Sequence, residues 1–165
     1  MAKLNIFKNK IFVSCLIIFI FFLIDRITKE LVIRYVENNF DYEIFTSNYL
    51  NIILTWNDGI AFGLLSQNDS LIYNLISLLI FTIILVLVWM LKSNYGISFF
   101  ALLLIIGGAV GNFYDRIVNK SVPDFIDFHV GEFHWFVFNF ADVFISIGVI
   151  IMIFIEIFFN IKYNE

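Results

Sequence analysis

Two aspartates, Asp124 and Asp142, are the residues of this chain best suited to catalysis. Two carboxyl groups held close together cannot easily both ionise, so one pKa rises and the pair shares one proton. The ionised member can take a proton from water while that water attacks a carbonyl carbon. The neutral member polarises the carbonyl and later helps to protonate the leaving amine. Such a pair would hydrolyse a peptide bond, and we expect it to need no cofactor and no metal.

The segment between the two aspartates predicts how they meet. A two-residue hairpin turn at Gly131-Glu132 would pair Val130 with Phe133. Counting outward in that register, Asp124 faces Asn139. The hairpin would therefore carry Asp124 back to the place where the next helix begins.

Asn139 is a favoured residue for the N-cap of that helix, which puts Asp142 at its third position. The positive end of the helix dipole favours negative charge on Asp142, so we assign Asp142 as the initial base and Asp124 as the protonated acid. The alternative carries about equal weight from spacing alone. In that interpretation Asp142 only caps the helix, and Asp124 lies in a solvated turn after Pro123.

Other catalytic chemistries have less support in the sequence. There is no H-E-x-x-H zinc motif and no G-x-S-x-G serine elbow. His129 and His134 are five residues apart in the expected hairpin and are interpreted as interfacial residues rather than metal ligands. Cys15 is the only cysteine and is expected to be an inert packing thiol.

The amino-acid composition indicates that these residues lie in a membrane protein. The chain has 165 residues, of which 61% are hydrophobic and only 15% charged. A soluble domain has about 45–50% apolar and about 25% charged residues. A core of this size cannot bury the excess, so we expect a single membrane-embedded domain over residues 1–165. The net charge of -4 argues against a nucleic-acid partner.

Four helices are expected at about 8–35, 70–92, 96–116 and 139–161, since about 20 helical residues cross a bilayer. Three of these helices carry polar residues at one end, and alternation puts those ends on the same side. Ionisable groups at bilayer depth are expensive, so each is a functional hypothesis. Besides the two aspartates these groups are Asp25, Lys29, Asp115 and Arg116. Asp25 and Lys29 are spaced to form an ion pair on one helix face, and Arg116 would offset the charge of the clustered acids.

The remaining segments, about 36–69 and 117–138, are expected to hold strands on the outer side. Residues 41–46, 50–56 and 124–139 have strand character, and Asn57-Asp58-Gly59 is a turn signal. Lysines near the first helix, the second turn and the last helix place both termini in the cytoplasm. The polar helix ends then face outward. Gly107-x-x-x-Gly111 is a small-residue face for close helix packing.

Five sequence blocks occur in the order and spacing of a known family. They are Asp25-Arg26-Ile27-Thr28-Lys29, Asn57 to Gly63, Gly111 to Arg116, Val122 to Phe128 and Phe138 to Asp142. Together they resemble the bacterial lipoprotein signal peptidases, also called signal peptidase II. The resemblance covers nearly the whole chain. It implies an all-α integral membrane protein with four transmembrane helices and a small extracytoplasmic β-cradle.

The resemblance also implies an aspartyl endopeptidase of the bacterial inner membrane. Its substrates are diacylglyceryl-modified prolipoproteins, cut just before the lipidated cysteine, and globomycin-type cyclic peptides inhibit it. The catalytic pair of the family falls on Asp124 and Asp142. Its supporting or substrate-binding positions fall on Asp25, Lys29, Asn57, Gly59, Asn112, Arg116, Asn139 and Ala141. We expect a monomer among membrane lipids.

One departure from the family pattern is Pro123, where relatives often carry an apolar β-branched residue. Proline lacks a backbone donor, so we expect a local change in strand pairing with activity retained. Two rival functions remain. A small ion or proton transporter would use Asp25, Asp115 and Asp142, but the second and third helices carry no charge midway along their length. A noncatalytic scaffold would use the polar ends only as anchors.

Overall fold

The computed structural model describes residues 2–58 and 70–159 of the chain. Within them lie four helices long and apolar enough to cross a membrane. They are α1 (Ala2–Asn39), α2 (Ser70–Met90), α3 (Gly96–Asn119) and α4 (Phe140–Phe159). The expected fold class, a four-helix membrane protein with a small sheet, is confirmed.

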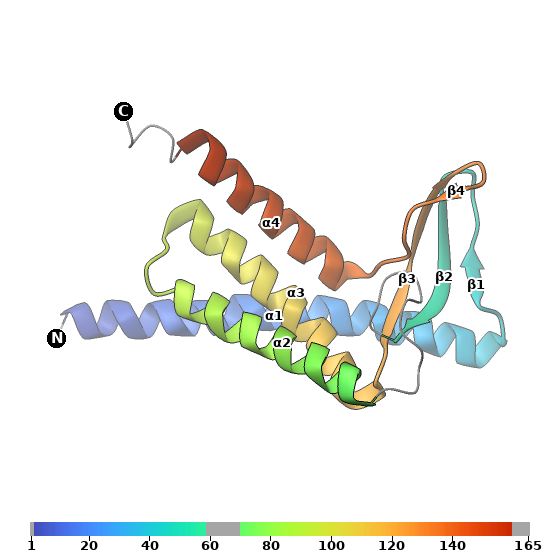
Figure 1. Ribbon diagram of the computed structural model, residues 1–165, viewed down its shortest axis with the longest axis horizontal. Coiled ribbons are helices and arrows are strands. Elements are labelled where there is room, and N and C mark those ends of the chain that lie inside the picture. Colours follow the sequence, from blue (N-terminus) through green and yellow to red (C-terminus); the bar gives the residue numbers. More distant parts are fainter. Residues whose placement is uncertain (1, 59–69, 160–165) are drawn as a thin grey trace.

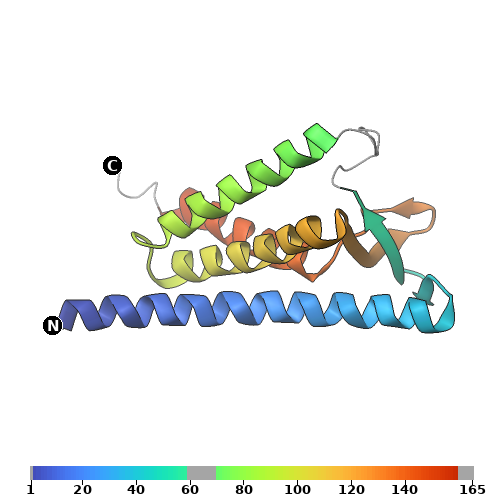
Figure 2. The same cartoon turned by 90° about the horizontal axis from the view of Figure 1, so that it is seen from below.

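Helix α1 is longer than the sequence predicts, because it continues past about residue 35 to Asn39. At 1.5 Å per residue its 38 residues span about 57 Å, nearly twice the hydrocarbon thickness of a bilayer. It ends where Phe40 adopts a positive φ of 53°. The amide of Phe40 donates to the carbonyl of Val36 at 2.8 Å, which closes the last turn. The second half of α1 therefore extends out of the bundle to contact the sheet (Figure 2).

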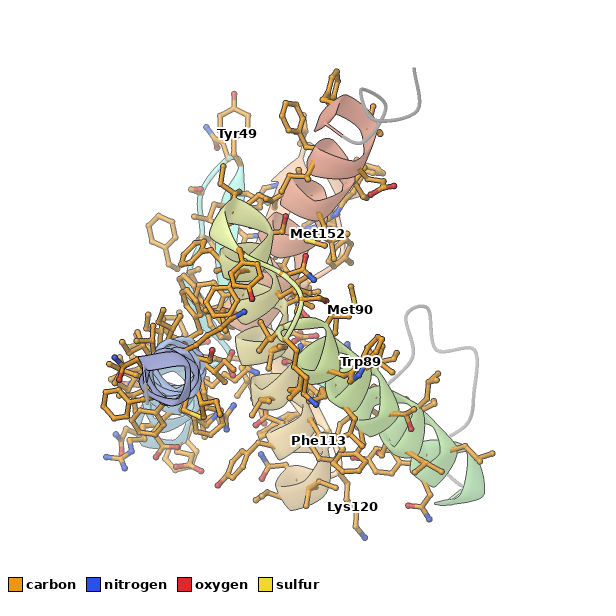
Figure 3. All side chains as sticks on the ribbon, turned by 90° about the vertical axis from the view of Figure 1, so that its left-hand side faces the viewer. Tyr49, Trp89, Met90, Phe113, Lys120 and Met152 are labelled. Atoms are coloured by element: carbon orange, nitrogen blue, oxygen red, sulfur yellow. The ribbon has the colours of Figure 1, made fainter. Side chains whose placement is uncertain are left out.

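Helix α3 lies at the centre of the bundle. In its most apolar window 56% of the residues are buried, against 11% in each of the other three helices. Viewed along α1, the other helices surround α3, and α2 contacts no helix but α3 in the described part of the chain (Figure 3). The outward faces of α1, α2 and α4 expose leucine, isoleucine and phenylalanine, which suits contact with lipid.

A four-stranded antiparallel sheet stands at one end of the bundle, in the order β1-β2-β3-β4. Its strands are β1 (Glu43–Phe45), β2 (Leu50–Asn57), β3 (Val122–Val130) and β4 (Phe133–His134). The first residues of α1 and the last turn of α4 lie at the opposite end (Figure 1). The polar ends of α3 and α4 meet the polar segment of α1 near the sheet. Asp25 and Lys29 lie within α1 rather than at its end, because the helix continues to Asn39.

The β3–β4 hairpin begins in the expected register but does not keep it. Val130 pairs with Phe133 across a turn in which Gly131 has a φ of 60°. Farther from the turn, the amides of both Phe125 and Ile126 donate to the carbonyl of Phe138, at 3.0 and 2.8 Å. Two residues thus face one, as in a β-bulge. The predicted register is therefore wrong by one residue at Ile126, which pairs with Phe138 instead of Val137.

Pro123 stands in register opposite Trp56 in the β2–β3 ladder. The irregularity of this ladder lies elsewhere, between Ile52 and Thr55, where β2 has one extra residue. The local change in pairing that we expected at Pro123 is not found at that position.

Two glycines of α3 set the distance to its neighbours at the level of the polar ends. A Cβ on Gly111 would lie 2.6 Å from Oδ2 of Asp25 on α1. A Cβ on Gly108 would lie 2.3 Å from the carbonyl oxygen of Ala141 on α4. Both contacts are too short for any side chain. Close packing through small residues, predicted for this part of α3, is confirmed.

Candidate active site

Asp142 is held in the first turn of α4 by a reciprocal capping interaction with Asn139. The Oδ1 atom of Asn139 accepts from the amide of Asp142 at 3.1 Å, and Oδ2 of Asp142 accepts from the amide of Asn139 at 3.1 Å. This is a capping box with aspartate at the third helical position. The predicted N-cap is confirmed, and it leaves the other oxygen of Asp142 free to face α3.

Asp124 reaches the same place from β3. It lies opposite Thr55, and because side chains alternate along a strand, Asn57 of β2 lies on the same face of the sheet. The side-chain amide of Asn57 donates through Nδ2 to Oδ2 of Asp124 at 2.9 Å. The side-chain amide of Asn139 donates to Oδ1 of Asp124 at 2.5 Å. Asp124 is only 3% exposed.

Asn139 therefore joins the two aspartates through one residue, with its backbone amide on Asp142 and its side-chain amide on Asp124. Asn112 of α3 completes the arrangement. Its Nδ2 donates to Oδ1 of Asp142 at 2.7 Å, and its Oδ1 accepts from Nδ2 of Asn139 at 3.2 Å. Each carboxyl group thus accepts two hydrogen bonds. The expected proximity of the two aspartates follows from these contacts, although the strand register differs from the predicted one.

Burial raises the pKa of Asp124 from 3.8 to about 6. The hydrogen bond from Asn57 lowers this pKa, the nearby charge of Asp142 raises it, and the hydrogen bond from Asn139 lowers it again. The loss of water around the carboxylate is the largest of these effects. Asp124 therefore retains a proton at a pH where an ordinary aspartate is fully ionised.

The raised pKa of Asp124 predicts a pH-dependent stability. The folded protein binds this proton more tightly than the unfolded chain, so its stabilising effect is complete below the usual pKa of 3.8 and is lost as the pH rises through about 6. The shift corresponds to about 3 kcal/mol of unfolding free energy. Unfolding in detergent micelles should show this loss in the wild type relative to Asp124→Asn. Parallel stability curves for the two proteins between about pH 4 and pH 7 would contradict it.

Lys29 lies behind the aspartates and is fully buried, with 0% exposure. A lysine ammonium has three donors, and all three are used. They bind Oδ2 of Asp25 at 2.9 Å, Oδ1 of Asn112 at 2.9 Å and Oδ2 of Asp115 at 2.7 Å. The predicted ion pair between Asp25 and Lys29 is confirmed. Among the described residues, Asn112 links Lys29 to Asp142 by hydrogen bonds, and the charge of Lys29 also acts on Asp142 directly.

Asp25 connects α1 to the beginning of α4. Its Oδ1 accepts from the backbone amide of Ala141 at 3.1 Å, one of the helix N-terminal amides that lacks a partner within the helix. Ala141 is fully buried, and its carbonyl oxygen lies against Gly108. A larger side chain at residue 141 would collide with its neighbours, because the alanine side chain is already fully buried.

Arg116 was expected to offset the charge of the clustered acids, and among the described residues it does so without an ion pair within 4 Å. Its Nη1 donates to the carbonyl of Asn112 at 3.2 Å, and among the described residues its buried Nε has no hydrogen-bond partner. It still interacts electrostatically with Asp142 and Asp124. Gly59, the remaining supporting position, lies outside the described residues.

Polar contacts of two further acids, Asp115 and Asp127, were not predicted. Arg26 forms a two-pronged ion pair with Asp115, and Asp127 of β3 binds His134 at 2.8 Å and Asn51 at 3.0 Å. An arginine next to a buried acid in an apolar helix needs a carboxylate partner, and that signal was present in the sequence. The second contact leaves His134 half exposed, and the described residues hold no group of His, Cys, Asp or Glu arranged to bind a metal.

A cavity of about 540 Å³ opens beside Asp142. One wall is α4, with Asp142, Val143 and Ile147, and the other is the β3–β4 hairpin and the segment after it. That second wall is mainly aromatic and includes Phe128, Phe133, Trp135, Phe136 and Phe138. The cavity is an apolar space with a carboxylate at one side.

The sequence profile described as Signal peptidase (SPase) II matches residues 17–159. The chain belongs to the signal peptidase II family. A lipoprotein signal peptidase of Pelagibacter ubique (strain HTCC1062) is 48% identical over 162 residues, which cover 98% of this chain and 96% of the relative. One of Francisella tularensis subsp. novicida (strain U112) is 38% identical over 138 residues, covering 81% and 84%.

The family assignment agrees with the fold. A bacterial membrane enzyme solved at 2.3 Å resolution superposes with a TM-score of 0.68 and 29% identity, covering 88% of this chain and 87% of that one. A second bacterial membrane enzyme, solved at 1.9 Å resolution, superposes with a TM-score of 0.66 and 30% identity, covering 86% of this chain and 90% of that one. The protein is a peptidase of the signal peptidase II type and a multi-pass membrane protein.

Proposed function

We propose that the protein is an aspartic endopeptidase that removes signal peptides from diacylglyceryl-modified prolipoproteins by cleaving before the lipidated cysteine. The observation that carries this proposal is the bridge through Asn139, which binds Asp142 with its backbone amide and Asp124 with its side chain. The bridge brings two carboxyl groups from distant parts of the chain to one place. Both are available for general acid–base catalysis.

In the proposed reaction the ionised Asp142 removes a proton from water as the water oxygen attacks the scissile carbonyl carbon. The protonated Asp124 donates a hydrogen bond and then its proton to the carbonyl oxygen. The tetrahedral intermediate returns that proton to Asp124, and the proton held by Asp142 passes to the leaving amine as the C–N bond breaks. The pKa of about 6 for Asp124 and the position of Asp142 at a helix N-terminus support these roles.

The cavity beside Asp142 supports a lipid-modified substrate. Its aromatic and aliphatic walls suit acyl chains or an apolar signal segment, and the exposed apolar faces of the helices let such a substrate enter from the lipid. The relatives in Pelagibacter and Francisella are lipoprotein signal peptidases. We extend that substrate class to this chain.

We further propose that the sheet and the two aspartates lie at the extracytoplasmic face, with both termini in the cytoplasm. Lys10 of α1 donates to the carbonyl of Asn94 at 2.9 Å, so the beginning of α1 and the α2–α3 connection, which contains Lys92, share one side. Clustered lysines mark the cytoplasmic side of membrane proteins. The sheet is at the other end of the helices.

Incubation of the purified protein with a diacylglyceryl-modified precursor tests the proposal. We expect cleavage before the modified cysteine, inhibition by globomycin, and a much slower reaction with the same precursor lacking the lipid. In sealed vesicles, the cleaved lipoprotein should be accessible to an added protease only when the vesicles are right-side-out. Equal cleavage of the two precursors would exclude recognition of the lipid, and no cleavage of either would exclude the activity.

A further inference from the structure

Arg26 of α1 binds Asp115 of α3 at the interface of the two helices, and its Nη2 atom also lies 3.4 Å from Oδ2 of Asp25. The Nη1 atom lies 2.7 Å from Oδ1 and the Nη2 atom 2.7 Å from Oδ2, so the guanidinium binds both carboxylate oxygens. Asp115 is fully buried, while the side chain of Arg26 is 20% exposed and lies over the ring of Tyr114. A two-pronged pair of this kind fixes the direction of the carboxylate.

The bound carboxylate is the first member of a hydrogen-bond chain that ends at the aspartates. Oδ2 of Asp115 also accepts from Lys29 at 2.7 Å, and Lys29 donates to Oδ1 of Asn112 at 2.9 Å. Since lysine can only donate, this contact settles which end of the Asn112 amide faces Asp142. The Nδ2 atom of Asn112 then donates to Asp142 at 2.7 Å.

Within the described residues, the charges around this hydrogen-bond chain balance when Arg26 is included. Glu30 and Arg34, which share a surface pocket with Arg26, pair with each other and add no net charge. The charged groups facing it are Asp25 and Lys29 from α1, Asp115 and Arg116 from α3, Asp124 from β3 and Asp142 from α4. With one proton shared between Asp124 and Asp142, the four acids carry three negative charges. Arg26, Lys29 and Arg116 carry three positive charges. Without Arg26 the cluster has a net negative charge, and the aspartates would bind protons more tightly.

We propose that Arg26 is a positioning residue for peptide cleavage. The ion pair between Arg26 and Asp115 fixes the hydrogen bond from Lys29 to Asn112. The positive charge of Arg26 also keeps the cluster of charged residues neutral while the two proposed catalytic aspartates share one proton. Arg26 itself does not line the cavity beside Asp142, so it acts on the reaction through other residues. This inference rests on the proposed function.

The test is the pH profile of cleavage by Arg26→Gln in the full-length protein. Removing a positive charge roughly 10 Å from an acid, at an effective dielectric constant of about 20, makes the acid about one pH unit harder to ionise. We therefore expect the acidic limb of the kcat/KM profile to move up by about one pH unit. The loss should be mainly in kcat, with KM changed by less than about twofold, and Arg26→Lys should restore most of the shift.

Arg34→Gln is the matched control. It removes the same charge from the same helix two turns away, where Arg34 is exposed and pairs with Glu30. Its profile should match the wild type. An unshifted profile in Arg26→Gln, a uniform loss at every pH, or an equal shift in Arg34→Gln would overturn the inference.

A second variant keeps the test decisive if Arg26→Gln does not fold. The double variant Arg26→Gln with Asp115→Asn removes one positive and one negative charge. The acidic limb of its kcat/KM profile should lie at the same pH as in the wild type. A limb displaced in the double variant would overturn the role of charge balance. Failure of this inference leaves wild-type cleavage and its dependence on the two aspartates unchanged, so it is distinct from failure of the proposed function.

Discussion

Asp142→Asn should abolish cleavage of a diacylglyceryl-modified precursor, with kcat reduced by about 10³-fold or more, and Asp124→Asn should do the same. An amide cannot take a proton from the attacking water or return one to the leaving group. Both substitutions preserve side-chain volume, and an asparagine oxygen can still accept one of the two hydrogen bonds at each site. Single-turnover cleavage by purified variants measures the loss, and the unfolding transition in micelles shows whether the fold is retained.

Asp127→Asn is the matched control for this prediction. Asp127 is on the same strand as Asp124 and is equally buried, but its contacts are with Asn51 and His134. We expect its rate to stay within about threefold of the wild type. A wild-type rate in either variant of the catalytic pair would end the assignment of that residue. Inactivity of Asp127→Asn as well would indicate that any lost carboxylate on β3 damages the site.

Lys29→Met should lower the free energy of unfolding by about 3–5 kcal/mol, the range found when one partner of a buried ion pair is removed. Lys29 is fully buried and binds two carboxylates and one amide. Methionine fills the same volume but removes the 2.9 Å ion pair with Asp25 and the 2.7 Å ion pair with Asp115. Arg26 then remains at 3.4 Å from Asp25 and at 2.7 Å from Asp115. Denaturant-induced unfolding in mixed micelles measures the change.

Two further variants separate charge from packing in this prediction. Arg34→Met removes an exposed cation of the same helix and should change stability by less than about 1 kcal/mol. Adding Asp25→Asn to Lys29→Met removes a buried carboxylate whose remaining ion pair, with Arg26, is 3.4 Å long, and should recover part of the lost stability. A loss below about 1 kcal/mol for Lys29→Met, or no recovery in the double variant, would show that the buried charges are not what stabilises this interface.

The sequence alone was sufficient to predict the helices, the hairpin turn and the helix cap, because these depend on the order of neighbouring residues. Apolar runs too short to cross a bilayer predicted that α1 and α3 continue through their charged residues, and both helices do so. The Gly131-Glu132 turn and the cap at Asn139 were also readable, because turn and cap preferences involve only a few neighbouring residues. The two aspartates followed from the same local signals together with the family pattern.

The tertiary structure decided what connects these residues. A bulge near Phe138 displaces the pairing of Ile126 by one residue, and the side chain of Asn139 binds the side chain of Asp124. The partners of Lys29 and the two-pronged ion pair of Arg26 with Asp115 depend on how closely α1 approaches α3. Local sequence pattern specifies periodicity and turns, but contacts between segments about 80 to 90 residues apart depend on packing distances that glycines such as Gly111 set only in the folded bundle.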